Sequence, residues 1–128
     1  MDQATLVVIG PDLNEGQRLL DRLEHDGIPV AAALWYLEPG STHWRLIISS
    51  PLFENLGPLD AYEVIQRSLA RLEGTRLALD DTAARPPSEP IVRALRKVYR
   101  DLPQRGYWLQ GTVVDGVYID NAYLYFVK

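Results

Sequence analysis

Three aspartates could supply the oxygen ligands of a divalent metal ion. Asp80 and Asp81 are adjacent at the expected end of a strand, and Asp12 follows an earlier apolar segment. Carboxylate oxygens suit Mg²⁺, and such a site would make the protein a metal-assisted hydrolase or nuclease. Adjacent carboxylates between a strand and a loop also serve as solvated turn formers. We therefore assign no metal ligand and no cofactor from the sequence, and keep this chemistry as an alternative.

A second polar group surrounds the turn of an expected hairpin and consists of Glu38, Ser41, His43 and Arg45. His43 could act as a general base held by Glu38, with Ser41 as the nucleophile. The tip of a hairpin is flexible and wet, which is poor ground for the positioning that catalysis needs. We therefore assign no catalytic residue here and expect polar side chains on a solvated turn.

A basic segment stands out in an otherwise acidic chain. Residues 85–105 carry six basic and two acidic side chains, a local charge of +4, whereas the whole chain has a net charge of −4. The helix expected at residues 88–102 places four basic residues mostly on the side away from its apolar stripe: Arg93, Arg96, Lys97 and Arg100. This face could meet phosphates or an acidic protein surface, and the charge asymmetry also permits self-association. A solvated helix face is the ordinary alternative.

Three tyrosines near residue 128 could form a surface that binds a protein partner. If the last strand shifts phase by one residue, Tyr118, Tyr123 and Tyr125 share a half-exposed face. Tyrosine rings offer a large contact area with little rotamer entropy to lose, and they are enriched in interface hot spots. The alternative is that a helix covers this face and buries the rings.

Several classes of site are excluded by the sequence itself. The chain has no cysteine, which removes disulfides, thiolate nucleophiles, iron–sulfur clusters and cysteine-based zinc sites. It contains no G-x-x-x-x-G-K-[ST], G-x-S-x-G or H-E-x-x-H motif, the signatures of P-loops, nucleophile elbows and zincins. Its only histidines, His25 and His43, cannot assemble a multi-histidine metal centre within one chain.

The composition is that of an ordinary globular domain, with 47% hydrophobic and 23% charged residues. A length of 128 residues predicts one domain over residues 1–128. No apolar run approaches the ~18 residues that a membrane span needs, and the first residues lack a signal-peptide pattern. We therefore expect a cytoplasmic protein without membrane contact. The negative net charge makes nucleic acid a less favoured partner than protein.

The elements that must position these residues follow from periodicity and turn signals. The apolar run at residues 5–10 predicts a buried strand, and the helix after it should be capped by Asn14 and end at Gly27. The rest of the pattern predicts two strands around a turn at residues 38–42, a helix between Pro58 and Gly74, a marginal strand at 75–81, a proline-rich linker at 82–90 and a last helix capped by Ser88.

The C-terminal residues predict a hairpin around Asp115-Gly116, because both positions of such a turn need positive φ. A one-residue bulge at Asp120-Asn121 would then align the apolar residues on one face: Val117, Ile119, Ala122, Leu124 and Phe126.

The predicted element order is β-α-β-β-α-(β)-α-β-β, and its first six elements match a ferredoxin-like split βαβ. We expect the α+β class, with a mixed or mostly antiparallel sheet of five or six strands and three helices packed on one face. The segments "WRLIISSPLFENLGPLDAY" and "GTVVDGVYIDNAYLYFV" resemble parts of short bacterial proteins that have no assigned activity. The resemblance spans most of the chain and implies a bacterial source and a compact α+β domain. It implies no cofactor and no catalytic residue.

The sequence favours a non-enzymatic interaction module that binds a protein partner or a second copy of itself. The binding surface would be the tyrosine face or the basic helix. One alternative is the metal-assisted hydrolase or nuclease built on Asp12, Asp80 and Asp81. The other is weak nucleic-acid binding through helix 88–102.

Overall fold

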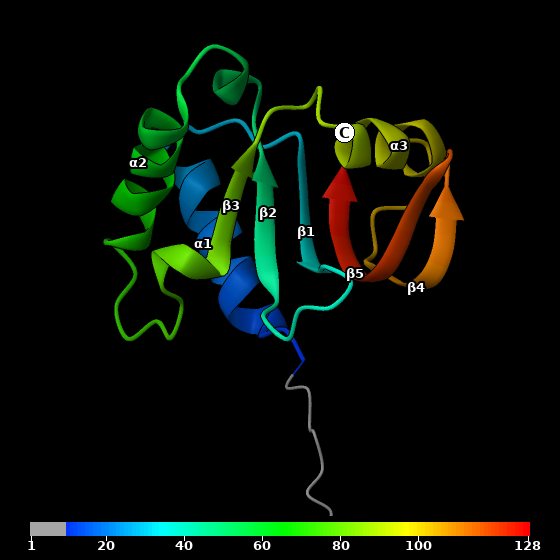
Figure 1. Cartoon of the computed structure of the whole chain (residues 1–128). Coiled ribbons are helices and arrows are strands. Elements are labelled where there is room, and N and C mark those ends of the chain that lie inside the picture. Colours follow the sequence, from blue (N-terminus) through cyan, green and yellow to red (C-terminus); the bar gives the residue numbers. More distant parts are fainter. Residues whose placement is uncertain (1–9) are drawn as a thin grey trace, which may run out of the picture.

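A computed structural model describes residues 10–128 of the chain. These residues form three helices and a five-stranded mixed sheet, which confirms the predicted α+β class (Figure 1). The helices are α1 (Leu13–His25), α2 (Pro58–Leu69) and α3 (Pro90–Tyr99), and the strands are β1 (Ala32–Leu37), β2 (Arg45–Ser49), β3 (Thr82–Arg85), β4 (Tyr107–Val114) and β5 (Val117–Val127). Within this range no helix is long and apolar enough to cross a membrane. The strand predicted at residues 5–10 falls, except for Gly10, outside the described residues.

Across the sheet the strand order is β3-β2-β1-β5-β4. β3 pairs parallel with β2, and the other three pairs are antiparallel. The parallel pair is joined by a crossover that contains α2, as parallel neighbours require. β3 and β4 are the two edge strands of this five-stranded sheet.

The helix ends differ from the predicted ones by a few residues. Asp12, and not Asn14, caps α1, because the Asp12 carboxylate accepts a hydrogen bond of 3.1 Å from the backbone N–H of Glu15. α2 begins at Pro58 as predicted. α3 is shorter than residues 88–102, and Glu89 rather than Ser88 stands at its N-cap position.

The strand predicted at residues 75–81 is wrong, and the linker predicted at residues 82–90 is shorter than expected, because residues 82–85 form β3 and only residues 86–89 are irregular. Leu79–Asp81 forms a short 3-10 helix, and the Asp81 carboxylate closes this turn by accepting a hydrogen bond of 2.8 Å from the Ala78 N–H. The strand is instead β3, whose residues Thr82 and Ala83 are buried. Alanine has low strand propensity, but residues 82–85 pair with β2 along their whole length, and this pairing outweighs propensity.

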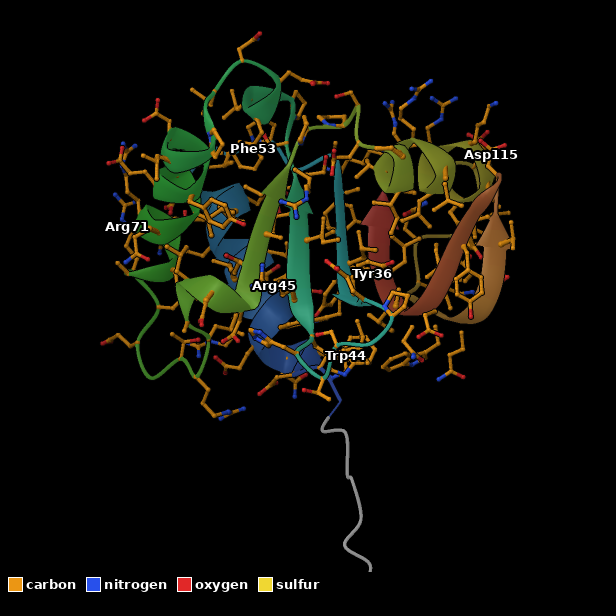
Figure 2. All side chains as sticks on the ribbon, viewed as in Figure 1. Tyr36, Trp44, Arg45, Phe53, Arg71 and Asp115 are labelled. Carbon is orange, nitrogen blue, oxygen red and sulfur yellow. The ribbon has the colours of Figure 1, made fainter. Side chains whose placement is uncertain are left out.

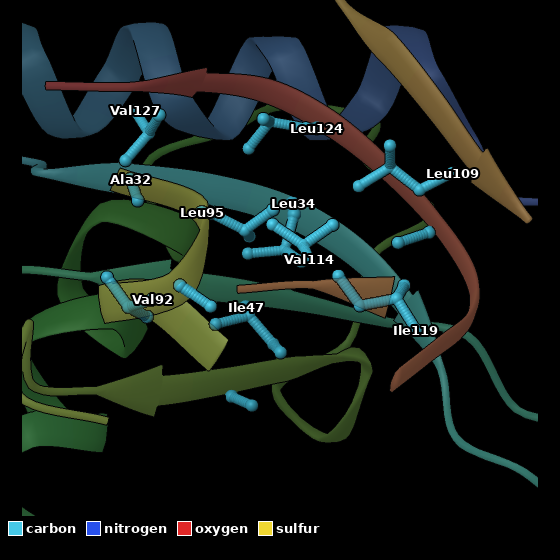
Figure 3. Packing of buried hydrophobic residues seen from close by; sticks show 13 residues of the cluster. Ala32, Leu34, Ile47, Val92, Leu95, Leu109, Val114, Ile119, Leu124 and Val127 are labelled. Atoms are coloured by element: carbon cyan, nitrogen blue, oxygen red, sulfur yellow. The ribbon is translucent and has the colours of Figure 1, made fainter. Parts of the chain in front are cut away.

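Helices cover both faces of the sheet, which corrects the prediction that they pack on one face. Successive side chains of a strand point to opposite faces. In β1, Leu34 belongs to the core under α3, whereas Trp35 belongs to the core under α1 and α2. Figure 3 shows the α3 core, where Val92 and Leu95 of α3 meet Leu34 and Ile47 of the sheet.

The β4–β5 hairpin curls toward α3 because both of its strands change face midway. Asp115 (φ 45°) and Gly116 (φ 81°) form the predicted two-residue turn. The β4–β5 register is the same on either side of Gly111, but Gly111 has a φ of 55° and the pair Gly111–Asp120 is missing from the ladder. Leu109 and Val114 are an odd number of residues apart, so in a regular strand they would point to opposite faces of the sheet. The break at Gly111 between them places both side chains in the α3 core.

The phase change predicted at Asp120-Asn121 is confirmed, because Ile119 and Ala122 both belong to the α3 core; since β4 is interrupted at the same place, the β4–β5 register does not shift. A second, unpredicted one-residue offset falls against β1 at Tyr125, between the paired residues Leu124 and Phe126. Phe126 packs on the α1 side, contrary to the prediction. The β5 residues of the α3 core are Ile119, Ala122, Leu124 and Val127, with Val117 packed against them.

Candidate functional site

Helix α3 separates an apolar inner face from a basic outer face. Its buried residues Val92, Ala94 and Leu95 fix the orientation of the helix on the sheet. The basic residues then lie on the opposite side, because positions i, i+3, i+4 and i+7 of a helix share a face. These positions are Arg93, Arg96, Lys97 and Arg100. The sequence thus predicted the composition of this face correctly.

The four basic side chains line a single groove of about 500 Å³ between α3 and the turn of the β4–β5 hairpin. The rest of the lining comes from Pro90, Ala94, Asp115 and Val117. Figure 2 shows Asp115 at the hairpin tip beside α3, and nitrogen-tipped side chains of the helix that point away from the sheet. We call this cavity the α3 groove.

The α3 groove keeps most of its positive charge. Lys97 Nζ is 3.8 Å from the Asp115 carboxylate, which is the one acidic side chain in the lining. Arg96 donates from Nε to the backbone carbonyl of Lys128 at 2.8 Å, so this arginine also anchors α3 to the end of β5. Among residues 10–128, Arg93 has no ion-pair partner, and Arg100 approaches only the exposed Asp101 at 3.9 Å. Ion pairs this long and exposed neutralise little charge.

The three predicted tyrosines do not form one open face. Tyr118 is 53% exposed, and its hydroxyl donates to Asp120 at 3.2 Å, which raises the pKa of Tyr118. Tyr123 is half-buried and makes edge contacts with Trp108 and Tyr125. Partner binding through this face stays a prediction, and the structure leaves only its outer part accessible.

Tyr125 lies between the sheet and α1. Its hydroxyl donates to the Leu13 carbonyl at 2.6 Å and accepts a hydrogen bond of 2.9 Å from Trp35 Nε1. Burial raises the pKa of Tyr125 to about 12. A side chain at Gly16 would overlap this hydroxyl, so the glycine is what lets α1 approach so closely. Tyr125 therefore joins the helix to the sheet.

The polar residues of the first hairpin do meet, but not as a Ser–His pair. Glu38, Ser41, His43 and Arg45 all line a cavity of about 390 Å³ on the α3 face of the sheet. The Ser41 hydroxyl bonds to the backbone of His43 and not to its ring. The partner of the imidazole is Asp81, whose carboxylate lies 2.8 Å from Nε2, in place of the predicted Glu38. Ser41 therefore lacks the base that would activate it.

The three aspartates of the metal hypothesis do not gather at one point, and two of them have other partners. Asp12 forms an ion pair of 2.5 Å with Arg76, which lowers the pKa of Asp12. Asp81 bonds to His43, and although Asp12 and Asp81 line one cavity of about 260 Å³, Asp80 is not part of that lining. Among the described residues, no group of three or more histidine, aspartate or glutamate side chains is placed to hold a metal ion. The convergence that a carboxylate metal site needs is therefore missing from this part of the chain.

The α3 groove contains one charged residue that the sequence did not indicate as part of a site. Asp115 was predicted only as a turn residue, and no pattern showed that its turn would lie beside α3. That placement depends on the curl of the hairpin, which begins at Gly111. Comparison of the chain with protein families, curated proteins and solved structures found no match.

Proposed function

We propose that this protein is a non-enzymatic interaction module whose α3 groove receives an acidic segment of a protein partner. The observation that carries the proposal is the gathering of Arg93, Arg96, Lys97 and Arg100 in one groove that holds a single carboxylate. Charge of one sign in a concave site attracts a partner of the opposite sign and sets its orientation.

The size of the groove limits the partner. From Arg93 to Arg100 the helix makes two turns, which is roughly 10 Å along its axis. A segment that presents two or three carboxylates over that length would match the basic face. Because each exposed ion pair contributes only ~0.2–1 kcal/mol, binding should be weak and sensitive to salt.

A titration tests the proposal directly. The probe is a synthetic peptide of roughly two or three helical turns with glutamate at every third or fourth position, the spacing that places side chains on one face. We expect it to shift the amide NMR signals of α3 and of the 114–117 turn, and Arg93→Glu to weaken binding by about tenfold, the equivalent of ~1.4 kcal/mol. No binding at low salt would overturn the proposal.

The matched control is Arg67→Glu, which changes the net charge by the same amount. Arg67 lies on α2, and its only ion pair among the described residues joins it to the exposed Glu63. If the proposal is right, Arg67→Glu binds the peptide as the wild type does. Equal weakening by both substitutions would show that the peptide senses overall charge rather than the groove.

Nucleic acid is the second candidate because phosphates would use the same basic face. The net charge of −4 opposes it, since an extended polyanion meets the acidic body as well as the groove. A single-stranded oligonucleotide provides the test. If it binds more tightly than the peptide, with an affinity that falls linearly against salt on a logarithmic scale and is lost in Arg93→Glu, it displaces the protein partner as the proposed ligand.

A further inference from the structure

We infer that the acidic segment received by the α3 groove is helix α1 of a second copy of this chain. The inference rests on the function proposed above, because it names the occupant of the same groove. It starts from a second groove, also of about 500 Å³, that lies between α1, residues 27–30 and the last residues of the chain, Phe126 and Lys128. Its polar lining includes Gln17, Asp21 and Glu24, and its floor is apolar, with Leu20 and Phe126.

The two helices carry polar stripes with the same spacing. On α1, the exposed residues Gln17, Asp21 and Glu24 occupy positions i, i+4 and i+7. On α3, the same positions are filled by Arg93, Lys97 and Arg100. Steps of four and three residues are about 6 Å and 4.5 Å along a helix, and this order matches when the two helices run parallel. An antiparallel match would use Arg96 in place of Lys97, but Arg96 Nε already donates to the Lys128 carbonyl.

In the parallel arrangement each stripe meets complementary groups. Lys97 of one copy faces Asp21 of the other, Arg100 faces Glu24, and Arg93 faces the amide oxygen of Gln17. Gln17 also holds the acidic stripe in place, because its amide donates to Asp21 at 2.9 Å. The arrangement brings Arg100 near the C-terminal end of α1, where the helix dipole favours positive charge.

Each groove also holds one charge of the minority sign, and these two charges are complementary as well. The basic groove contains Asp115, and the groove of α1 contains Lys128. The Lys128 ammonium lies over the Phe126 ring, 5.4 Å from its centroid, at the rim of the groove. The minority charges of the two grooves are therefore also of opposite sign.

The contact must form between two molecules. Within one molecule α1 and α3 pack on opposite faces of the sheet, as Figure 1 shows, so their outer sides cannot meet. Each copy consequently offers one basic and one acidic surface. Since the pairing consists mainly of exposed charges, the association should be weak and should disappear at high ionic strength.

The test is the mass of the protein in solution, measured by sedimentation equilibrium at up to about 1 mM protein, since a few exposed ion pairs give weak association. At about 0.01 M salt, where charges act over about 30 Å, we expect the average mass to rise with concentration above the 14.5 kDa of one chain. At about 1 M salt, where that range is about 3 Å, the mass should return to 14.5 kDa.

Charge reversal identifies the two surfaces. Lys97→Glu with Arg100→Glu, and separately Asp21→Lys with Glu24→Lys, should each abolish the rise in mass. The variant that combines all four substitutions has the wild-type net charge of −4 and reversed stripes on both helices. It should self-associate again, and it should not associate with the wild type, because like stripes would then face each other.

Three outcomes separate this inference from the proposed function. A wild type that stays monomeric at low salt while it still binds the glutamate peptide overturns the inference and leaves the proposed function intact. A wild type that neither associates nor binds the peptide overturns both. If the wild type associates but a folded four-substitution variant does not, the copies use another surface and the inference is wrong. If the four-substitution variant does not fold, the two double variants decide. The inference then requires that each of them abolishes association while it keeps the wild-type circular dichroism spectrum.

Discussion

At the scale of single residues, the hydroxyl groups of two tyrosines on β5 have different roles. The Tyr125 hydroxyl joins three elements, because it bonds to Leu13 at the start of α1 and to Trp35 of β1 while its ring belongs to β5. The Tyr118 hydroxyl is on the surface and bonds to Asp120 two residues away on the same strand. The sequence placed both tyrosines in one group because it showed their spacing but not which helix covers them.

This difference predicts the effect of removing each hydroxyl. Tyr125→Phe leaves the buried Trp35 N–H and the Leu13 carbonyl without their partner, which should lower the free energy of unfolding by ~1–3 kcal/mol. Tyr118→Phe should change it by less than about 0.5 kcal/mol. Urea denaturation followed by circular dichroism measures both, and equal values for the two variants would contradict the proposed role of Tyr125.

At the scale of elements, Asp26 joins α1 to α2. Its carboxylate pairs with Arg22 of α1 at 2.7 Å, accepts a hydrogen bond of 2.7 Å from Ser68 of α2, and lies 2.9 Å from Arg71. These partners, Arg22 above all, hold the pKa of Asp26 well below its ordinary value of 3.8. A carboxyl group whose pKa is lower in the folded protein contributes stability above its unfolded pKa and loses that contribution as the pH falls.

Asp26→Asn should therefore lower the melting temperature at neutral pH, and the difference from wild type should shrink as the pH falls below 3.8. Glu63→Gln is a suitable control, because Glu63 forms only an exposed pair with Arg67 among the described residues. Melting curves recorded from neutral to acid pH provide the measurement. A pH-independent difference would mean that Asp26 acts through packing and not through its charge.

Element by element, the sequence predicted best where local chemistry decides. Asp115-Gly116 specifies its turn, and Pro58 marks the start of α2, because each residue restricts its own backbone. β3 was missed because its alanines become a strand only through pairing with β2. The basic residues of the α3 groove could be predicted from helical spacing, whereas the cavity could not, since it also needs the curl of a hairpin that begins at Gly111.

At the scale of the whole molecule, two hydrophobic cores share one sheet. Leu95 is fully buried in the α3 core and Leu19 in the core under α1 and α2. β1 contributes Leu34 to one core and Trp35 to the other, so neither core can open without loosening the strand behind both. Small domains built in this way unfold in a single transition.

Leu95→Ala and Leu19→Ala should each lower the free energy of unfolding by ~2–5 kcal/mol, since both remove fully buried side chains. In each variant, tryptophan fluorescence and far-ultraviolet circular dichroism should give the same midpoint in urea. Val98→Ala, at a position on α3 that is 45% exposed, serves as the control and should have a much smaller effect. Two separate midpoints in either leucine variant would show that the faces unfold independently.

The local break at Gly111 in β4 also bears on how the protein avoids aggregation. β4 is an edge strand of eight residues, with Trp108 54% and Val113 65% exposed. A long, regular, apolar edge offers unpaired amide and carbonyl groups to any passing chain, and such edges seed fibrous assembly. The left-handed backbone of Gly111 turns those groups out of line halfway along β4, so an incoming strand could align with one half of the edge but not with both.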